Sequence, residues 1–122
     1  MEATRPEDAG YTVDFDPVNG ALLVVGTGEL DLAAAPRLAT VLSIATAGAE
    51  PCVVLDLTAV DFIDSTALGA IMHASTEAEA TGKSMLVVAL DGPVRRLLEI
   101  TNLTGRFRVY PSREDALAAA AA

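Results

Sequence analysis

The centre of the 122-residue chain reads Val53-Val-Leu-Asp-Leu-Thr-Ala-Val-Asp-Phe-Ile-Asp-Ser-Thr-Ala-Leu-Gly69. The quoted stretch begins inside an apolar run, residues 52–57, whose length and composition predict a buried central strand that ends near Leu57. A short connection then leads to Asp64 and Ser65, either of which can cap a helix by accepting a hydrogen bond from a free backbone N–H. The residues that follow have the spacing of one helix face, at Leu68, Ile71, Met72 and Ser75. A strand followed by a helix is the unit from which α/β folds are built.

The flanking sequence repeats this alternation of strand and helix patterns. Asn19-Gly20 is typical of a hairpin turn, and the strand before it would bury Val13 and Phe15. The predicted order is β-β-α-β-α-β-α-β-α, which implies a mixed, mostly parallel sheet of about five strands packed by about four helices. The predicted strands cover residues 11–15, 21–25, 52–57, 85–90 and 107–110, and the helices follow Pro36, Asp64, Pro93 and Ser112.

Length and composition limit the classes of protein that this chain can be. Apolar residues make up 52% of it, and 8 basic against 17 acidic residues leave a net charge of −9. Binding to nucleic acid or to an anionic membrane needs a basic face, so neither is expected as a partner. The single cysteine, Cys52, excludes an internal disulfide and a multi-cysteine zinc site, and its place before an apolar run predicts a buried thiol.

The chain is short enough to form one domain. We expect a flexible leader over residues 1–10, a folded domain over 11–118 and a fraying tail over 119–122. The start of the chain has acidic residues and lacks the basic and apolar regions of a signal peptide. No apolar run approaches the roughly 18 residues that a membrane helix requires. We therefore expect a cytoplasmic protein.

The residues alone leave two interpretations of the segment 64–66. In one, these side chains only cap a helix, as Asp-Ser-Thr sequences commonly do. In the other, Ser65 is a phosphorylation switch. A helix N-terminus tolerates a phosphate, and the roughly 1.5 to 2 added negative charges would change the surface that a partner meets.

Three motifs resemble those of the STAS domain, the fold of bacterial anti-sigma factor antagonists. Gly28-Glu-Leu-Asp31 is similar to the family's first signature, and Asp61-Phe-Ile-Asp-Ser-Thr-Ala-Leu-Gly69 resembles the segment that holds its phosphorylated serine. Gly92-Pro-Val-Arg-Arg-Leu-Leu-Glu-Ile-Thr-Asn-Leu103 is similar to the helix after the fourth strand. The resemblance covers roughly residues 11–118, nearly the whole chain, with the motifs in the same order.

The resemblance implies a function as well as a fold. Ser65 matches the phosphoacceptor, Thr66 matches a neighbour that is not usually the main acceptor, and Asp31 matches an acidic residue whose loop lies beside the serine. In the family, the unphosphorylated form binds an anti-sigma factor, often a GHKL-type serine kinase, and so frees the sigma factor. The kinase phosphorylates the serine and ends the complex, and a PP2C-type phosphatase restores it. The expected partner-binding residues are Asp31, Asp64, Ser65, Thr66, Leu68 and Gly69, with small Ala67, Gly69 and Ala70 leaving a flat patch beside the serine.

The sequence gives less support to the hypothesis that this chain is an enzyme. His73 lies eight residues beyond Ser65 on one helix, about 12 Å along its axis, which is too far for a nucleophile and its base. Gly26-Thr-Gly28 lacks the spacing of a phosphate-binding loop and reads as a turn at the end of a strand. Asp56 and Asp61 are similar to a receiver's phosphoaspartate, but the paired acids that would hold Mg²⁺ are not evident. Arg95 and Arg96 read as a solvated helix face. We expect no catalytic residue, no metal and no cofactor.

A different class of function stays open at this stage. A STAS domain can also serve as an assembly subunit of a transporter or a signalling scaffold, with no phosphorylation cycle. In that case Ser65 would be a helix cap only.

Overall fold

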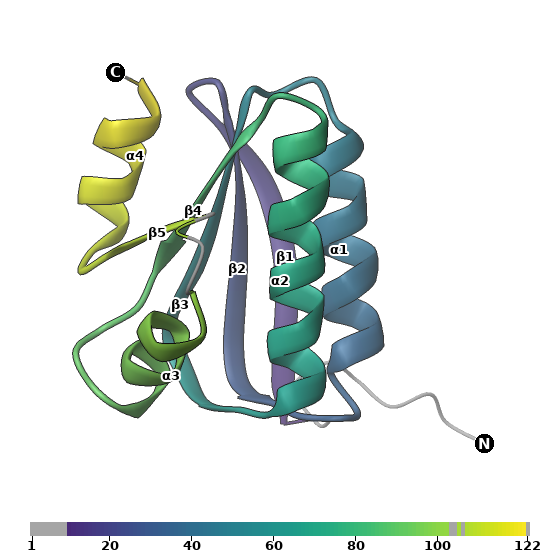
Figure 1. Cartoon of the computed structure of the whole chain (residues 1–122), viewed down its shortest axis with the longest axis vertical. Helices are drawn as coiled ribbons and strands as arrows, with labels where there is room; N and C mark the ends of the chain where they lie inside the picture. The colour runs from purple at the N-terminus through teal and green to yellow at the C-terminus, as the bar shows by residue number, and fades with distance from the viewer. Residues whose placement is uncertain (1–9, 103–104, 106, 122) are drawn as a thin grey trace.

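The computed structural model describes residues 10–102, 105 and 107–121. They form a five-stranded sheet in the order β1-β2-β3-β4-β5, with β1 antiparallel to β2 and the later neighbours parallel (Figure 1). The predicted element order and the mixed sheet are confirmed. The strands are β1 (Tyr11–Val18), β2 (Ala21–Leu30), β3 (Cys52–Ile63), β4 (Ser84–Val88) and β5 (Arg108–Tyr110), and the helices are α1 (Ala35–Ala47), α2 (Ser65–Ala80), α3 (Pro93–Thr101) and α4 (Arg113–Ala121).

The predicted hairpin joins β1 to β2 through a turn of two residues. Val18 pairs with Ala21, and the turn residues Asn19 and Gly20 have φ of 47° and 85°. Positive φ at both central positions is the geometry that matches the twist of antiparallel strands, and Asn-Gly is the pair that adopts it most easily. The turn therefore fixes the register of the first strand pair.

Helices cover the two faces of the sheet unequally. Figure 1 shows α1 and α2 side by side on one face and α4 on the other. The larger core lies under α1 and α2, and alternate residues of β2 and β3 point into it, including Val24 and Leu55. A smaller core on the opposite face contains Leu23 and Val54 beneath Ala116 of α4. This burial on both faces explains why the central strands read as continuous apolar runs.

Three of the strands extend further than their sequence patterns predict. β1 runs to Val18, past its predicted end at Phe15. β2 continues through Gly26-Thr-Gly28 to Leu30, so the prediction of a turn there was wrong, and β3 continues past Leu57 to Ile63. The pairing of β2 with β3 shifts register twice along this extension, which marks irregularities in the ladder. Such bulges interrupt the alternation of buried and exposed side chains, so the polar and glycine residues there do not read as strand.

Several smaller predictions can be compared directly with the structure. Val13 is buried as predicted, but Phe15 is 43% exposed, so its assignment to the core was wrong. Cys52 is buried and free, as expected. α4 extends through Ala121, so most of the segment expected to fray is helical, and Ala122 lies outside the described residues. Residues 1–9 of the expected leader also lie outside them.

None of the helices in the described part of the chain combines the length and apolarity needed to cross a membrane.

Candidate functional site

The ends of β2 and β3 bring two connecting loops together at one edge of the sheet. Leu30 pairs with Ile63 at the last rung of the parallel ladder. The backbone N–H of Asp64, the next residue, donates to the carbonyl oxygen of Leu30 at 3.2 Å. The loop that begins at Asp31 therefore lies directly beside the start of α2, at the lower end of the sheet in Figure 1.

Asp64 is the N-cap of α2. Its Oδ1 accepts hydrogen bonds from the backbone N–H groups of Thr66 and Ala67, both at 3.0 Å. The Thr66 hydroxyl donates to the same oxygen at 2.6 Å. The Thr66 hydroxyl and then the Ala67 N–H hold the pKa of the Asp64 carboxyl below its usual value, and the N–H groups of Thr66 and Leu32 add to this. The cap is therefore a carboxylate that satisfies the free donors of the first turn.

Ser65 is the first residue of this helix, and its side chain is exposed to solvent. The hydrogen bonds of the described residues leave its hydroxyl unused, since the cap engages Thr66 and Ala67 instead. The neighbouring hydroxyls thus differ in chemistry. Ser65 is open to a reagent from solvent, whereas the Thr66 hydroxyl is committed to Asp64.

Asp31 has a similar local role at the end of β2. Its Oδ1 accepts from the backbone N–H groups of Ala33 at 3.0 Å and Ala34 at 3.3 Å, and its carbonyl oxygen accepts from Ala34 and Ala35. These bonds fix the tight turn that leads into α1. The structure thus places Asp31 beside the serine loop as an acidic residue whose own side chain holds its turn in shape.

The other expected binding residues lie on the next turn of α2. Leu68 is half-buried and packs against the larger core, so only part of it faces solvent. Gly69 is exposed, and a Cβ added to it would meet no atom within 4 Å. Ala67 is completely buried, so the expected flat patch does not include it. Ser65 and Gly69 stand one helical turn apart and present small, open positions to solvent.

Sequence reasoning missed Leu32, in the loop after β2, and Phe62, near the end of β3. The side chain of Leu32 is 71% exposed and that of Phe62 is 49% exposed. A Leu within the turn segment 31–35 belongs to no helical or strand pattern, and this misfit was the available signal. Phe62 gave no comparable signal, because a short apolar pair between Asp61 and Asp64 is equally compatible with a buried and an exposed side chain.

Comparison with known proteins agrees with this geometry. The model of the STAS domain matches residues 13–116. The chain belongs to the STAS domain family. A curated STAS relative, the anti-sigma-F factor antagonist RsfB of Mycobacterium tuberculosis, is 31% identical over 106 residues, which is 87% of this chain and 86% of RsfB.

Solved STAS structures extend the comparison. The crystal structure of an anti-sigma factor antagonist from Mycobacterium paratuberculosis is 30% identical, with a TM-score of 0.81 over 90% of this chain and 93% of that one. The anti-sigma factor antagonist SpoIIAA in its unphosphorylated form shares the fold at 20% identity, with a TM-score of 0.71 over 88% of this chain and 96% of that one. The phosphorylated form of SpoIIAA, from Bacillus, matches with a TM-score of 0.70 at 18% identity, covering 88% of this chain and 98% of that one.

The hypothesis that Asp56 corresponds to the phosphoaspartate of a receiver domain is contradicted by the surroundings of this residue. This side chain is 2% exposed, and its Oδ2 accepts from Nε of Arg113 at 2.6 Å. Its Oδ1 accepts from the backbone N–H of Thr58 at 2.9 Å. A carboxylate so enclosed holds α4 on the sheet and is closed to a phosphate donor. Among the described residues, no cluster of three or more His, Cys, Asp or Glu could hold a metal ion.

The other sequence candidates lie apart from the serine. His73 is a surface residue, with 77% of its side chain exposed and Nε2 3.8 Å from the Glu77 carboxylate. Arg95 pairs with Glu99 at 2.7 Å on the surface of α3. Within the described residues, neither His73 nor Arg95 makes a hydrogen bond or ion pair with Ser65.

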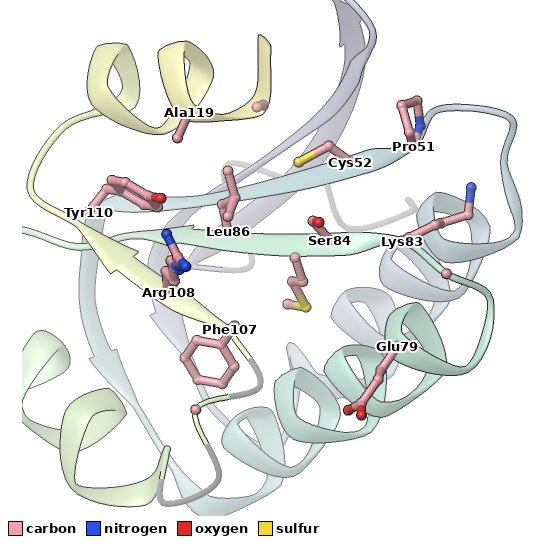
Figure 2. Close-up of a pocket in the computed structure, with 14 residues that line it drawn as sticks. Pro51, Cys52, Glu79, Lys83, Ser84, Leu86, Phe107, Arg108, Tyr110 and Ala119 are labelled. Atoms are coloured by element: carbon pink, nitrogen blue, oxygen red, sulfur yellow. The ribbon is translucent and has the colours of Figure 1, made fainter. Parts of the chain in front are cut away.

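A pocket opens at the opposite end of β3. Figure 2 shows Cys52 and Pro51 near one side of it and Arg108 and Tyr110 of β5 near another. Lys83 also lines it, but its Nζ donates to the carbonyl oxygens of Gly48 and Glu50 at 2.5 and 2.7 Å. Burial raises the pKa of the Cys52 thiol, which makes it a poor nucleophile. This pocket of the STAS domain therefore lies well away from Ser65 and offers little reactive chemistry.

Proposed function

We propose that this chain is a cytoplasmic anti-sigma factor antagonist whose binding is switched off by phosphorylation of Ser65. The observation that carries the proposal is the exposed Ser65 hydroxyl at the start of α2, beside the Asp31 loop. The names of RsfB and of the M. paratuberculosis protein, both about one-third identical to this chain, support the antagonist role. SpoIIAA, which shares the fold, has been solved with and without its phosphate.

Ser65 is better placed than Thr66 to accept the phosphate. A kinase that attached phosphate to Thr66 would first have to break its bond to the Asp64 carboxylate. It would then leave two negative groups in contact. Ser65 requires neither step, because its hydroxyl takes no part in the cap. This difference supports Ser65 as the acceptor and Thr66 as a part of the surface that the kinase and partner contact.

A phosphate on Ser65 acts through its charge on the docking surface. The N–H groups of Thr66 and Ala67, which could otherwise bind an anion at a helix start, already serve Asp64. The phosphate is therefore left to face solvent near Asp31, Asp61 and Asp64, and it adds about 1.5 to 2 negative charges there. A loss of about 3 kcal/mol in binding free energy is enough to weaken a complex by about a hundredfold.

The proposed partners follow from this cycle. An anti-sigma factor of the GHKL serine kinase type binds the surface formed by Asp31, Asp64, Ser65, Thr66, Leu68 and Gly69 when Ser65 is unmodified. The same kinase phosphorylates Ser65, and a PP2C-type phosphatase removes the phosphate. The chain itself is the substrate and the switch in this scheme, and catalysis belongs to its partners.

The experiment has two arms. Intact-mass analysis of the protein from its own cells, with peptide mapping, should find a single phosphate on Ser65 that a phosphatase removes. In the second arm, each serine-kinase-type anti-sigma factor of the organism is purified and its affinity for the chain is measured. Ser65→Ala should bind its cognate partner as wild type does and resist phosphorylation, whereas Ser65→Asp should bind about a hundredfold more weakly.

Thr66→Ser is the matched control, because it keeps a hydroxyl for the Asp64 cap and should still accept phosphate at Ser65 alone. A Ser65→Asp protein that binds as tightly as wild type would refute the switch. A Ser65 that stays unmodified through growth and stress would favour the alternative, an assembly subunit without a phosphorylation cycle.

A further inference from the structure

Leu32 is the most exposed large apolar side chain among those found at the surface of the described residues. Its side chain is 71% exposed, compared with 62% for Ile100 and 43% for Phe15. A leucine side chain that stays in water does not contribute the stabilisation that its burial would give. Such exposure beside the proposed binding site suggests that a partner covers the side chain. Phe62, 49% exposed near the end of β3, is the second large apolar side chain in this region.

The backbone on both sides of Leu32 is held rigidly. Asp31 accepts hydrogen bonds from Ala33 and Ala34 through its carboxylate and from Ala34 and Ala35 through its carbonyl oxygen. The loop that contains Leu32 begins beside the start of α2, since the backbone N–H of Asp64 donates to the carbonyl oxygen of Leu30 at 3.2 Å. A side chain presented by a preformed turn loses little backbone entropy on binding, and this favours tight association.

The surroundings of these two side chains are acidic. Neither segment 26–36 nor segment 58–82 contains a lysine or arginine. Glu29 pairs with Phe62 across the sheet, and Asp31, Asp61 and Asp64 stand beside the two apolar residues in sequence. Two copies of this surface would repel each other, so a second copy of the chain is a poor occupant. A basic surface is the complementary one.

We propose that Leu32 and Phe62 are the apolar anchors of the docking surface. The partner would receive Leu32 in an apolar cavity whose rim carries lysine or arginine. This inference rests on the proposed function, because it names the chemistry of the partner that binds around Ser65. A few buried anchors carry most of the energy in protein interfaces, and the charged rim sets mainly the rate and the salt dependence of association.

The test measures the affinity of the purified serine-kinase-type anti-sigma factor that binds wild type. Leu32→Ala should weaken binding about tenfold or more, and Phe62→Ala should weaken it about fivefold or more. Ile44→Ala is the control, since Ile44 is 47% exposed near the far end of α1, and it should stay within about twofold of wild type. Thermal unfolding of each variant checks that the exposed truncations leave the fold intact.

Salt provides the second readout. Raising the salt concentration from about 50 to 300 mM should weaken binding of wild type, because screening removes the attraction between acidic and basic rims. The proposed role of Leu32 as an anchor is refuted if Leu32→Ala binds the anti-sigma factor within about twofold of wild type while Ser65→Asp binds more weakly. That result would leave the proposed phosphorylation switch intact. Binding that is insensitive to salt would refute the basic rim. If wild type binds none of the organism's anti-sigma factors, the proposed function itself fails.

Discussion

Gly69→Ala should stabilise the free protein while weakening its complex with the anti-sigma factor. Gly69 lies in the second turn of α2, and glycine in a helix interior costs stability because its backbone loses more freedom on folding. An added Cβ would meet no atom of the chain within 4 Å, so no steric cost opposes the gain. No packing within the described residues therefore requires glycine at this position.

The magnitudes follow from these facts. Replacing glycine by alanine in an unstrained helix gains about 0.5–1 kcal/mol. For a chain of this size, that gain raises the melting temperature by roughly 2–6 °C. In the complex, a methyl group forced into a close-packed interface costs about 1–3 kcal/mol, which weakens binding by roughly five- to a hundredfold.

The assay pairs denaturant unfolding of the free protein with calorimetric titration of the purified partner. The control is Gly28→Ala, since Gly28 has a φ of 78° and an added Cβ there would overlap the carbonyl oxygen of Gly10. This control should destabilise the fold, in contrast to Gly69→Ala. A Gly69→Ala protein that is less stable than wild type would refute the analysis of the helix. One that is more stable but binds equally well would remove Gly69 from the docking surface.

Two further predictions concern the ion pair between Arg113 and Asp56 and the Asp64 cap of α2. Arg113→Ala should lower the free energy of unfolding by about 2 kcal/mol in urea titrations, because it strands the enclosed Asp56 carboxylate, with Arg113 itself 46% exposed. Asp56→Asn added to it should recover much of that loss, and additive losses would show that the pair is not coupled. Since the folded pKa of Asp64 is lowered, its stabilising effect is full above about pH 4 and disappears as the pH falls through the folded pKa. Asp64→Asn keeps a capping side chain that does not titrate, so unfolding midpoints measured below pH 4 should fall less steeply than those of wild type.

The sequence predicted those parts of the fold in which one local signal decides the structure. Asn19-Gly20 placed the hairpin because few other pairs adopt positive φ at both positions. The ends of β2 and β3 were missed because the ladder there contains bulges. At a bulge the backbone bonds continue while the alternation of side chains breaks, and periodicity reads only the side chains.

In the candidate site, too, features set by local sequence were predictable, whereas features set by contacts between distant residues or by side-chain conformation were not. The sequence left Asp64 and Ser65 as alternative caps, and in the structure Asp64 is the cap, through its bonds to Thr66 and Ala67. Phe62 is exposed in a part of the β2–β3 ladder that is irregular. Its pairing partner there, Glu29, lies more than thirty positions earlier in the sequence. The engagement of Thr66, which separates it from Ser65, depends on the rotamer of Asp64. Neither fact is encoded in residue spacing.

In the proposed switch, the different roles of the neighbouring Ser65 and Thr66 hydroxyls would let a phosphate on Ser65 control binding without unfolding the domain. Asp64 satisfies the first turn of α2 whether or not Ser65 is modified, because its bonds go to Thr66 and Ala67. A phosphate on Ser65 would therefore leave the hydrogen bonds of this helix start in place. The added charge of such a switch would act on the partner, whose surface has to be basic to complement the acidic residues around Leu32.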